Sequence, residues 1–148
     1  MIHKRYLPWL TLVEILSVVI AMSFFAGIVI LSVNPAKQFA DAHNARRRKD
    51  VTDILNAVYR YRNDHQGVLP ASITLTATEI CHTGKPCDGR IDLSEVTQSE
   101  KYLRTIPHDP YSDTPVNGTG YTIQKTAQGR VSVGAPHAEQ GVLIHVSR

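Results

Sequence analysis

The sequence predicts an α+β protein in which a long N-terminal helix, half apolar and half amphipathic, packs on a small antiparallel sheet of three strands. Three observations predict it: an apolar run at residues 10–33, helically spaced apolar residues between 51 and 58, and period-two alternation after residue 120. A chain of 148 residues leaves room for one folded domain beside the apolar run. The predicted division is a leader at 1–9, an apolar helix at 10–33 and a domain at 34–148.

Residues 10–33 contain a single charged side chain, that of Glu14. At the rise of an α-helix this run is about 36 Å long, enough to cross the ~30 Å hydrocarbon core of a bilayer. Glu14 lies one turn inside the run, where a carboxylate is costly unless it has a partner. We therefore expect a transmembrane helix that does more than anchor the chain.

The next helix is predicted at residues 35–66. Asn34 is a good N-cap and Pro35 a favoured first helical residue, so the segment starts there, either separately or as a kinked continuation of the apolar helix. The spacing of Val51, Ile54, Leu55 and Val58 puts these apolar side chains on one helix face. Gly67 is the predicted C-cap.

Residues 67–120 are predicted to form an irregular loop with a short helix near 94–103, because turn-forming Pro and Gly phrases recur there. Alternating or β-branched residues then predict strands at 121–125, 130–133 and 142–146, joined as a meander within 121–147. The apolar face of helix 35–66 is the expected cover for this sheet.

Two cysteines, Cys81 and Cys87, lie six residues apart in a loop rich in Gly and Pro. An even count at short spacing predicts a disulfide formed in an oxidising compartment. A zinc site that also uses His82 is a weaker alternative, because a fourth ligand and the usual two-residue spacing are missing.

Positive charge is concentrated in one segment. Residues 37–62 carry seven Lys or Arg side chains against three Asp, and four of the seven form the run from Arg46 to Lys49. We interpret the run as a solvated helix face, and nucleic-acid binding remains an unsupported alternative. Calcium binding by the side-chain oxygens of one loop is also a minor alternative, because their spacing does not match an EF-hand loop; these residues are Asp109, Ser112, Asp113 and Asn117.

No cofactor and no catalytic function are expected, because the sequence has no nucleophile-elbow, phosphate-loop or dinucleotide motif.

Thr11-Leu12-Val13-Glu14, followed by the unbroken apolar run, resembles the N-terminal signature of type IV pilins and pseudopilins. The resemblance implies that a prepilin peptidase cuts between Trp9 and Leu10 and that the new N-terminus is methylated. It also implies that Glu14, at the fifth mature position, meets the N-terminal amine of a neighbouring subunit's Leu10. The family pattern has a small residue before the cut, usually Gly, where this chain has Trp9.

The resemblance implies a structural subunit of a type IV pilus or a type II secretion-like pseudopilus. Such a subunit is a single-pass inner-membrane protein whose C-terminal domain lies outside the membrane. It joins copies of itself or other pilin-like subunits in a filament at the cell surface. The alternative is a non-polymerising anchored protein with an extracytoplasmic binding domain, which needs neither Glu14 nor the cut before Leu10.

Overall fold

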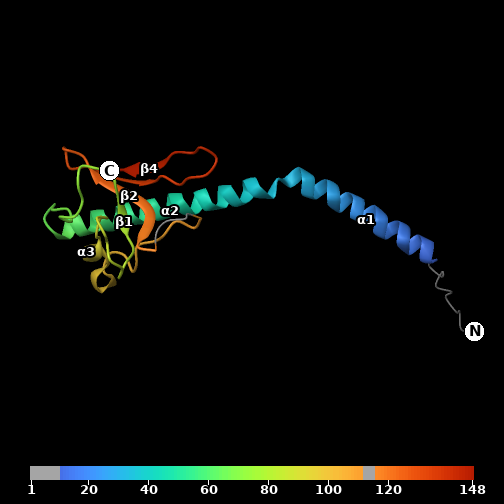
Figure 1. The fold of residues 1–148 in the computed structure, drawn as a ribbon, viewed down its shortest axis with the longest axis horizontal. Helices are drawn as coiled ribbons and strands as arrows, with labels where there is room; N and C mark the ends of the chain where they lie inside the picture. Colours follow the sequence, from blue (N-terminus) through green and yellow to red (C-terminus); the bar gives the residue numbers. More distant parts are fainter. Residues whose placement is uncertain (1–10, 112–115) are drawn as a thin grey trace, which may run out of the picture. The chain divides into compact units, whose positions relative to one another are not determined.

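The computed structural model describes residues 11–111 and 116–148. It is an α+β fold that divides into two compact units, Met1–Gln38 and Phe39–Arg148 (Figure 1). Along the chain the elements are α1 (Leu12–Val33), α2 (Pro35–Asp64), β1 (Thr78–Cys81), α3 (Ser94–Thr97), η1 (Gln98–Glu100), β2 (Gly118–Lys125), β3 (Val131–Ala135) and β4 (Ile144–Ser147).

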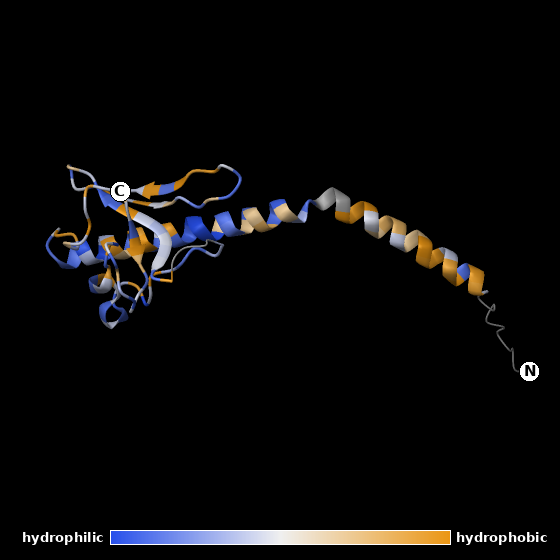
Figure 2. Ribbon diagram, viewed as in Figure 1, coloured by the Kyte–Doolittle hydropathy of each residue, from blue (hydrophilic) through white to orange (hydrophobic). Residues whose placement is uncertain are grey.

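Helix α1 is apolar on all sides, as Figure 2 shows by its orange colour along nearly its whole length. Its residues Leu12–Ile30 form the one described helix that is long and apolar enough to cross a membrane. No side chain described in α1 is buried within the chain. The predicted apolar helix is thus present, and its length and composition are compatible with a membrane-spanning segment.

The two helices are separate because α1 ends at Asn34, whose backbone adopts a left-handed conformation (φ 41°). Pro35 then starts α2, as predicted, with the backbone N–H of Lys37 directed at the Asn34 side-chain oxygen at 3.3 Å. One long, possibly bent helix was predicted over residues 10–66. The described residues 12–64 are mostly helical as predicted, but the break at Asn34 divides them into two helices. At the other end, the Gly67 N–H donates to the Arg62 carbonyl, and Gly67 has a φ of 89°.

The sheet has four antiparallel strands in the order β1-β2-β3-β4, so the prediction of three strands was wrong by one. β2, β3 and β4 form the predicted meander, with Ile123 opposite Val133 and Val133 opposite Val146. The additional strand, β1, pairs with β2 inside the segment predicted to be irregular. It was missed because it has only four residues and no clear alternation of apolar and polar side chains.

The core lies between α2 and the sheet. The four residues predicted to face the strands, Val51, Ile54, Leu55 and Val58, are all buried there. They share one cluster with side chains of all four strands: Ile80, Tyr121, Ile123, Val131, Val133, Ala135 and Ile144. The predicted packing of α2 on the strands is confirmed.

Within the segment between α2 and β2, the chain that follows the cysteine pair returns to lie beside β1. Ile80 of β1 forms an isolated parallel bridge with Ile91, through backbone hydrogen bonds of 2.8 and 2.9 Å. The helix predicted near residues 94–103 is shorter than expected. It consists of α3 and η1, and it is interrupted at Ser99, which has a φ of 56°.

Candidate functional site

The start of α1 is a capping box built from Thr11 and Glu14. The Glu14 N–H donates to Thr11 Oγ1 at 3.3 Å, and the Glu14 carboxylate accepts from the Thr11 N–H at 2.8 Å. The same carboxylate oxygen also lies 3.0 Å from Thr11 Oγ1. Glu14 therefore already has hydrogen-bond partners within its own chain, which the sequence prediction did not foresee.

The signal for this cap was in the sequence. Thr followed three residues later by Glu, just before an apolar run, is the capping-box pattern, and it was interpreted only as a family signature.

Leu10 and Trp9, the predicted cleavage residues, lie outside the described part of the chain. The pairing of Glu14 with a Leu10 amine therefore remains a prediction.

The other polar side chains described in α1 are also satisfied within the helix. Ser17 Oγ donates to the Glu14 carbonyl and Ser23 Oγ to the Val19 carbonyl, both at 2.8 Å. Hydroxyls that bond back to the preceding turn lose little when the helix leaves water. The described part of the helix, residues 12–30, can therefore present its surface to lipid or to other helices without an unsatisfied hydroxyl.

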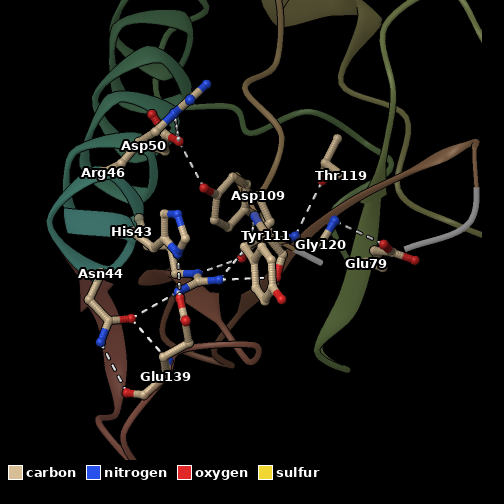
Figure 3. Close-up of polar contacts among 12 residues, drawn as sticks. His43, Asn44, Arg46, Asp50, Glu79, Asp109, Tyr111, Thr119, Gly120 and Glu139 are labelled. Atoms are coloured by element: carbon tan, nitrogen blue, oxygen red, sulfur yellow. Dashed lines mark hydrogen bonds and ion pairs between the residues drawn. The ribbon is translucent and has the colours of Figure 1, made fainter. Parts of the chain in front are cut away.

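A second polar cluster surrounds the Arg47 side chain of α2, which is fully buried. Arg47 forms a bidentate ion pair with Asp109, with Nε to Oδ2 at 2.7 Å and Nη2 to Oδ1 at 2.8 Å. Its Nη1 donates to Glu139 Oε2 at 2.7 Å and to Asn44 Oδ1 at 3.0 Å. Figure 3 shows Asp109, Tyr111, Asn44 and Glu139 gathered at this position.

The cluster joins α2 to the loop between β3 and β4. Asn44 pairs with the Glu139 backbone through two hydrogen bonds of 3.0 Å, and His43 Nδ1 lies 2.9 Å from Glu139 Oε2. The His43 ring also stacks on Tyr111 with a centroid distance of 5.3 Å. Three segments distant in sequence are thus held at one guanidinium.

Arg47 also controls how its partners titrate. Burial by itself would raise the pKa of Asp109, but hydrogen bonds from Arg47 and the Tyr111 N–H outweigh it and hold the pKa below its ordinary value. The pKa of Glu139 is lowered as well, first by its hydrogen bond from Arg47. Both carboxylates therefore remain ionised in the folded protein at pH values where they would begin to protonate in the unfolded chain.

We expect the folded domain to be sensitive to acid. Because both folded-state pKa values are lowered, the stabilisation is complete above the unfolded values of about 3.9 for Asp and 4.3 for Glu. It declines as the pH falls below those values and is lost below the folded-state pKa values. Urea unfolding at a series of pH values between 6 and about 2.5 should show this fall. An unfolding midpoint independent of pH over that range would contradict it.

The basic run on α2 is only partly the solvated face that was predicted. Arg46, Arg48 and Lys49 are exposed, but Arg47 is not, so the interpretation was wrong for that residue. Two of the exposed cations have acidic neighbours one turn on, with Lys49 2.7 Å from Asp53 and Arg46 3.8 Å from Asp50. With Arg47 withdrawn into the core, the run offers phosphate groups less charge than the sequence suggested.

The burial of Arg47 could have been predicted. Residue 47 lies four residues before Val51, so it falls on the same helix face as the apolar residues 51, 54 and 58. The same extrapolation reaches Asn44 and Ala40, which are also buried. The helical spacing of buried positions was followed only from Val51 onward, because Arg47 stands in a run of four basic residues that was interpreted as exposed.

Asp109 does not resemble a calcium ligand. It is buried, and both its oxygens accept hydrogen bonds from Arg47, with Oδ1 also accepting from the Tyr111 N–H at 2.9 Å. Its proposed partner Asp113 lies outside the described residues. Asn117 lies within them, and its side chain donates to Asp88.

Cys81 and Cys87 form the predicted disulfide, which closes a six-residue separation at the end of β1. A zinc site that uses both thiolates cannot coexist with this bond.

Comparison with protein-family models, with curated protein sequences and with solved structures gives no match.

Proposed function

We propose that this chain is a structural subunit of a pilin-like filament, either a type IV pilus or a type II secretion-like pseudopilus. One observation carries the proposal: α1 is a continuous helix of 22 residues, apolar all round, with its only acidic side chain in its first turn. Such a helix is suited to a bilayer, and equally to a bundle of identical helices.

The interior of a filament would have the same requirements as the bilayer. Helices that leave lipid lose apolar surroundings and regain them by packing against their neighbours, so little hydrophobic free energy separates the two states. The internally bonded Ser17 and Ser23 hydroxyls suit both environments. Assembly then depends on specific polar contacts, and within α1 the Glu14 carboxylate is the one ionisable group available for them.

In the proposal, Glu14 receives a second partner on assembly. Its capping bonds to Thr11 satisfy hydrogen-bonding capacity but leave the negative charge uncompensated. The N-terminal amine of a neighbouring subunit, freed by a prepilin peptidase at Leu10, would supply the positive charge. The disulfide supports placing the C-terminal domain outside the cytoplasm, because such bonds persist in oxidising compartments.

The capping box itself favours a second candidate, a non-polymerising anchored protein with an extracytoplasmic binding domain. A plain anchor helix gains a well-defined start from Thr11 and Glu14 without any neighbouring subunit. The two candidates therefore assign Glu14 different roles, a charge used in assembly or a cap used locally.

Two substitutions separate these roles. Glu14→Gln keeps the capping box, in which Gln serves as well as Glu, but removes the charge. Thr11→Ala removes the capping hydroxyl but keeps the charge. If the chain is a filament subunit, we expect Glu14→Gln to abolish filaments with membrane insertion intact, and Thr11→Ala to retain them.

The measurements are filament yield by electron microscopy of sheared cell-surface material, membrane content by immunoblot, and N-terminal sequencing of the membrane-purified chain. A free Leu10 N-terminus with filaments lost only in Glu14→Gln supports the proposal. Filaments that survive Glu14→Gln would contradict the assembly role of Glu14. An intact Met1 with no filaments from any variant would favour the plain anchor.

A further inference from the structure

We propose that, when the disulfide is reduced, the chain binds one zinc ion through Cys81, Cys87 and Asp92, with water as the fourth ligand. The two sulfur atoms and one Asp92 carboxylate oxygen all lie within 4.8 Å of one another. Asp92 supplies the ligand that the sequence could not identify, because it lies five residues beyond the cysteine pair. The inference concerns the thiol form alone and does not depend on filament assembly.

The framework that places these ligands does not rely on the disulfide. The bridge between Ile80 and Ile91 fixes the backbone next to Cys81 and next to Asp92, with the Cys81 N–H donating to the Ile91 carbonyl at 2.9 Å. A separate turn, closed by the Arg90 N–H donating to the Cys87 carbonyl at 2.9 Å, holds Cys87. Reduction therefore breaks one covalent bond and leaves the backbone hydrogen bonds around all three ligands.

The geometry and the ligand types fit zinc. On a tetrahedral zinc ion with Zn–S bonds of about 2.3 Å, two thiolates lie about 3.8 Å apart, a separation that the cysteine pair reaches once the S–S bond is broken. The Cα atoms of the two cysteines are 5.0 Å apart, which suits two ligands of one ion. Thiolates select zinc over the hard cations calcium and magnesium.

The surroundings also suit a metal ion. Cys81, Asp92 and Lys85 line a cavity of about 180 Å³, which leaves room for a bound water. One Asp92 oxygen accepts the Ser94 N–H at 2.8 Å, and this orients the carboxylate as outer-shell hydrogen bonds do in metal sites.

The chemistry balances in two steps. A thiol reductant gives two electrons and two protons to the disulfide, so the protein becomes a dithiol and the reductant becomes a disulfide. Zinc then displaces both thiol protons and forms two Zn–S bonds. Because the same sulfur atoms are used, zinc binding and the disulfide exclude each other.

The test uses the full chain in detergent, reduced with a phosphine and titrated with Co²⁺ as a spectroscopic substitute for zinc. We expect one equivalent to produce cobalt–thiolate charge-transfer absorption and the intense visible bands of four-coordinate cobalt, both removed by stoichiometric Zn²⁺. The oxidised protein should show neither.

Two Asp variants distinguish the proposed site from adventitious thiol binding. Asp92→Asn should lower the affinity at least ~10-fold, since even outer-shell losses have effects of that size. The matched control is Asp88→Asn, an exposed carboxylate of the same loop that pairs with Asn117, and it should leave the affinity unchanged. Absence of the one-equivalent spectrum in the reduced chain, or equal affinities for Asp92→Asn and the unaltered chain, would overturn the proposal.

Discussion

Replacing Arg47 by Met should lower the free energy of unfolding by about 3–5 kcal/mol, the typical cost of removing one member of a buried ion pair. The loss arises mainly from the partner that is left behind. Asp109 is buried, and among the described residues only the Tyr111 N–H would remain as a hydrogen-bond donor to its carboxylate. Methionine approximates the length of the arginine stem, so the cavity contribution stays small.

Arg48→Met is the matched control, because residue 48 adjoins Arg47 on the same helix and its side chain is exposed. Its unfolding free energy should stay within about 0.5 kcal/mol of the unaltered protein. Urea unfolding followed by near-ultraviolet circular dichroism, which reports on buried tyrosines such as Tyr121, measures both variants. Equal effects of the two substitutions would refute the structural role of Arg47.

Leu55→Ala should be destabilising by about 2–5 kcal/mol, the range for removing a large aliphatic side chain from a packed core. Leu55 is 5% exposed and belongs to the cluster that joins α2 to the sheet. The surrounding side chains come from both layers, so the space left by leucine cannot be refilled without moving a strand or the helix.

The control for this core substitution is Leu143→Ala, because Leu143 is 89% exposed. The same chemical change there removes little buried area and should alter the unfolding free energy by no more than about 0.5 kcal/mol. If Leu55→Ala and Leu143→Ala had the same urea midpoint, the assignment of α2 as the cover of the sheet would fail.

Features that depend on local sequence were predictable. The apolar run of α1, the start of α2 at Pro35 and the three strands of the meander all carry strong local signals, and the structure places each near its predicted range. The boundary between α1 and α2 was ambiguous, because Pro35 can begin a new helix or kink an existing one. The left-handed Asn34 decides for a break.

Features that depend on distant partners were not predictable. β1 is a strand because β2 lies beside it and Ile91 bonds its other edge, while its own four residues carry little preference. The two acidic partners of Arg47 follow it by 62 and 92 residues, and no local pattern links them to it. Asp92 joins the cysteine pair in the same way, through a backbone bridge rather than a sequence spacing.

The order in which the chain is made gives the Arg47 cluster a further consequence. Glu139 follows Arg47 by 92 residues, a delay of roughly 5–18 s at common rates of synthesis. Until Glu139 has been synthesised, a buried guanidinium would lack one of its acidic partners and one hydrogen-bond acceptor. The Arg47 side chain is then more stable in water than in the core. The apolar stripe that shares its face, Val51, Ile54 and Val58, is then also delayed in leaving solvent. We therefore expect a chain that still lacks Glu139 to keep α2 open and accessible to proteases and chaperones.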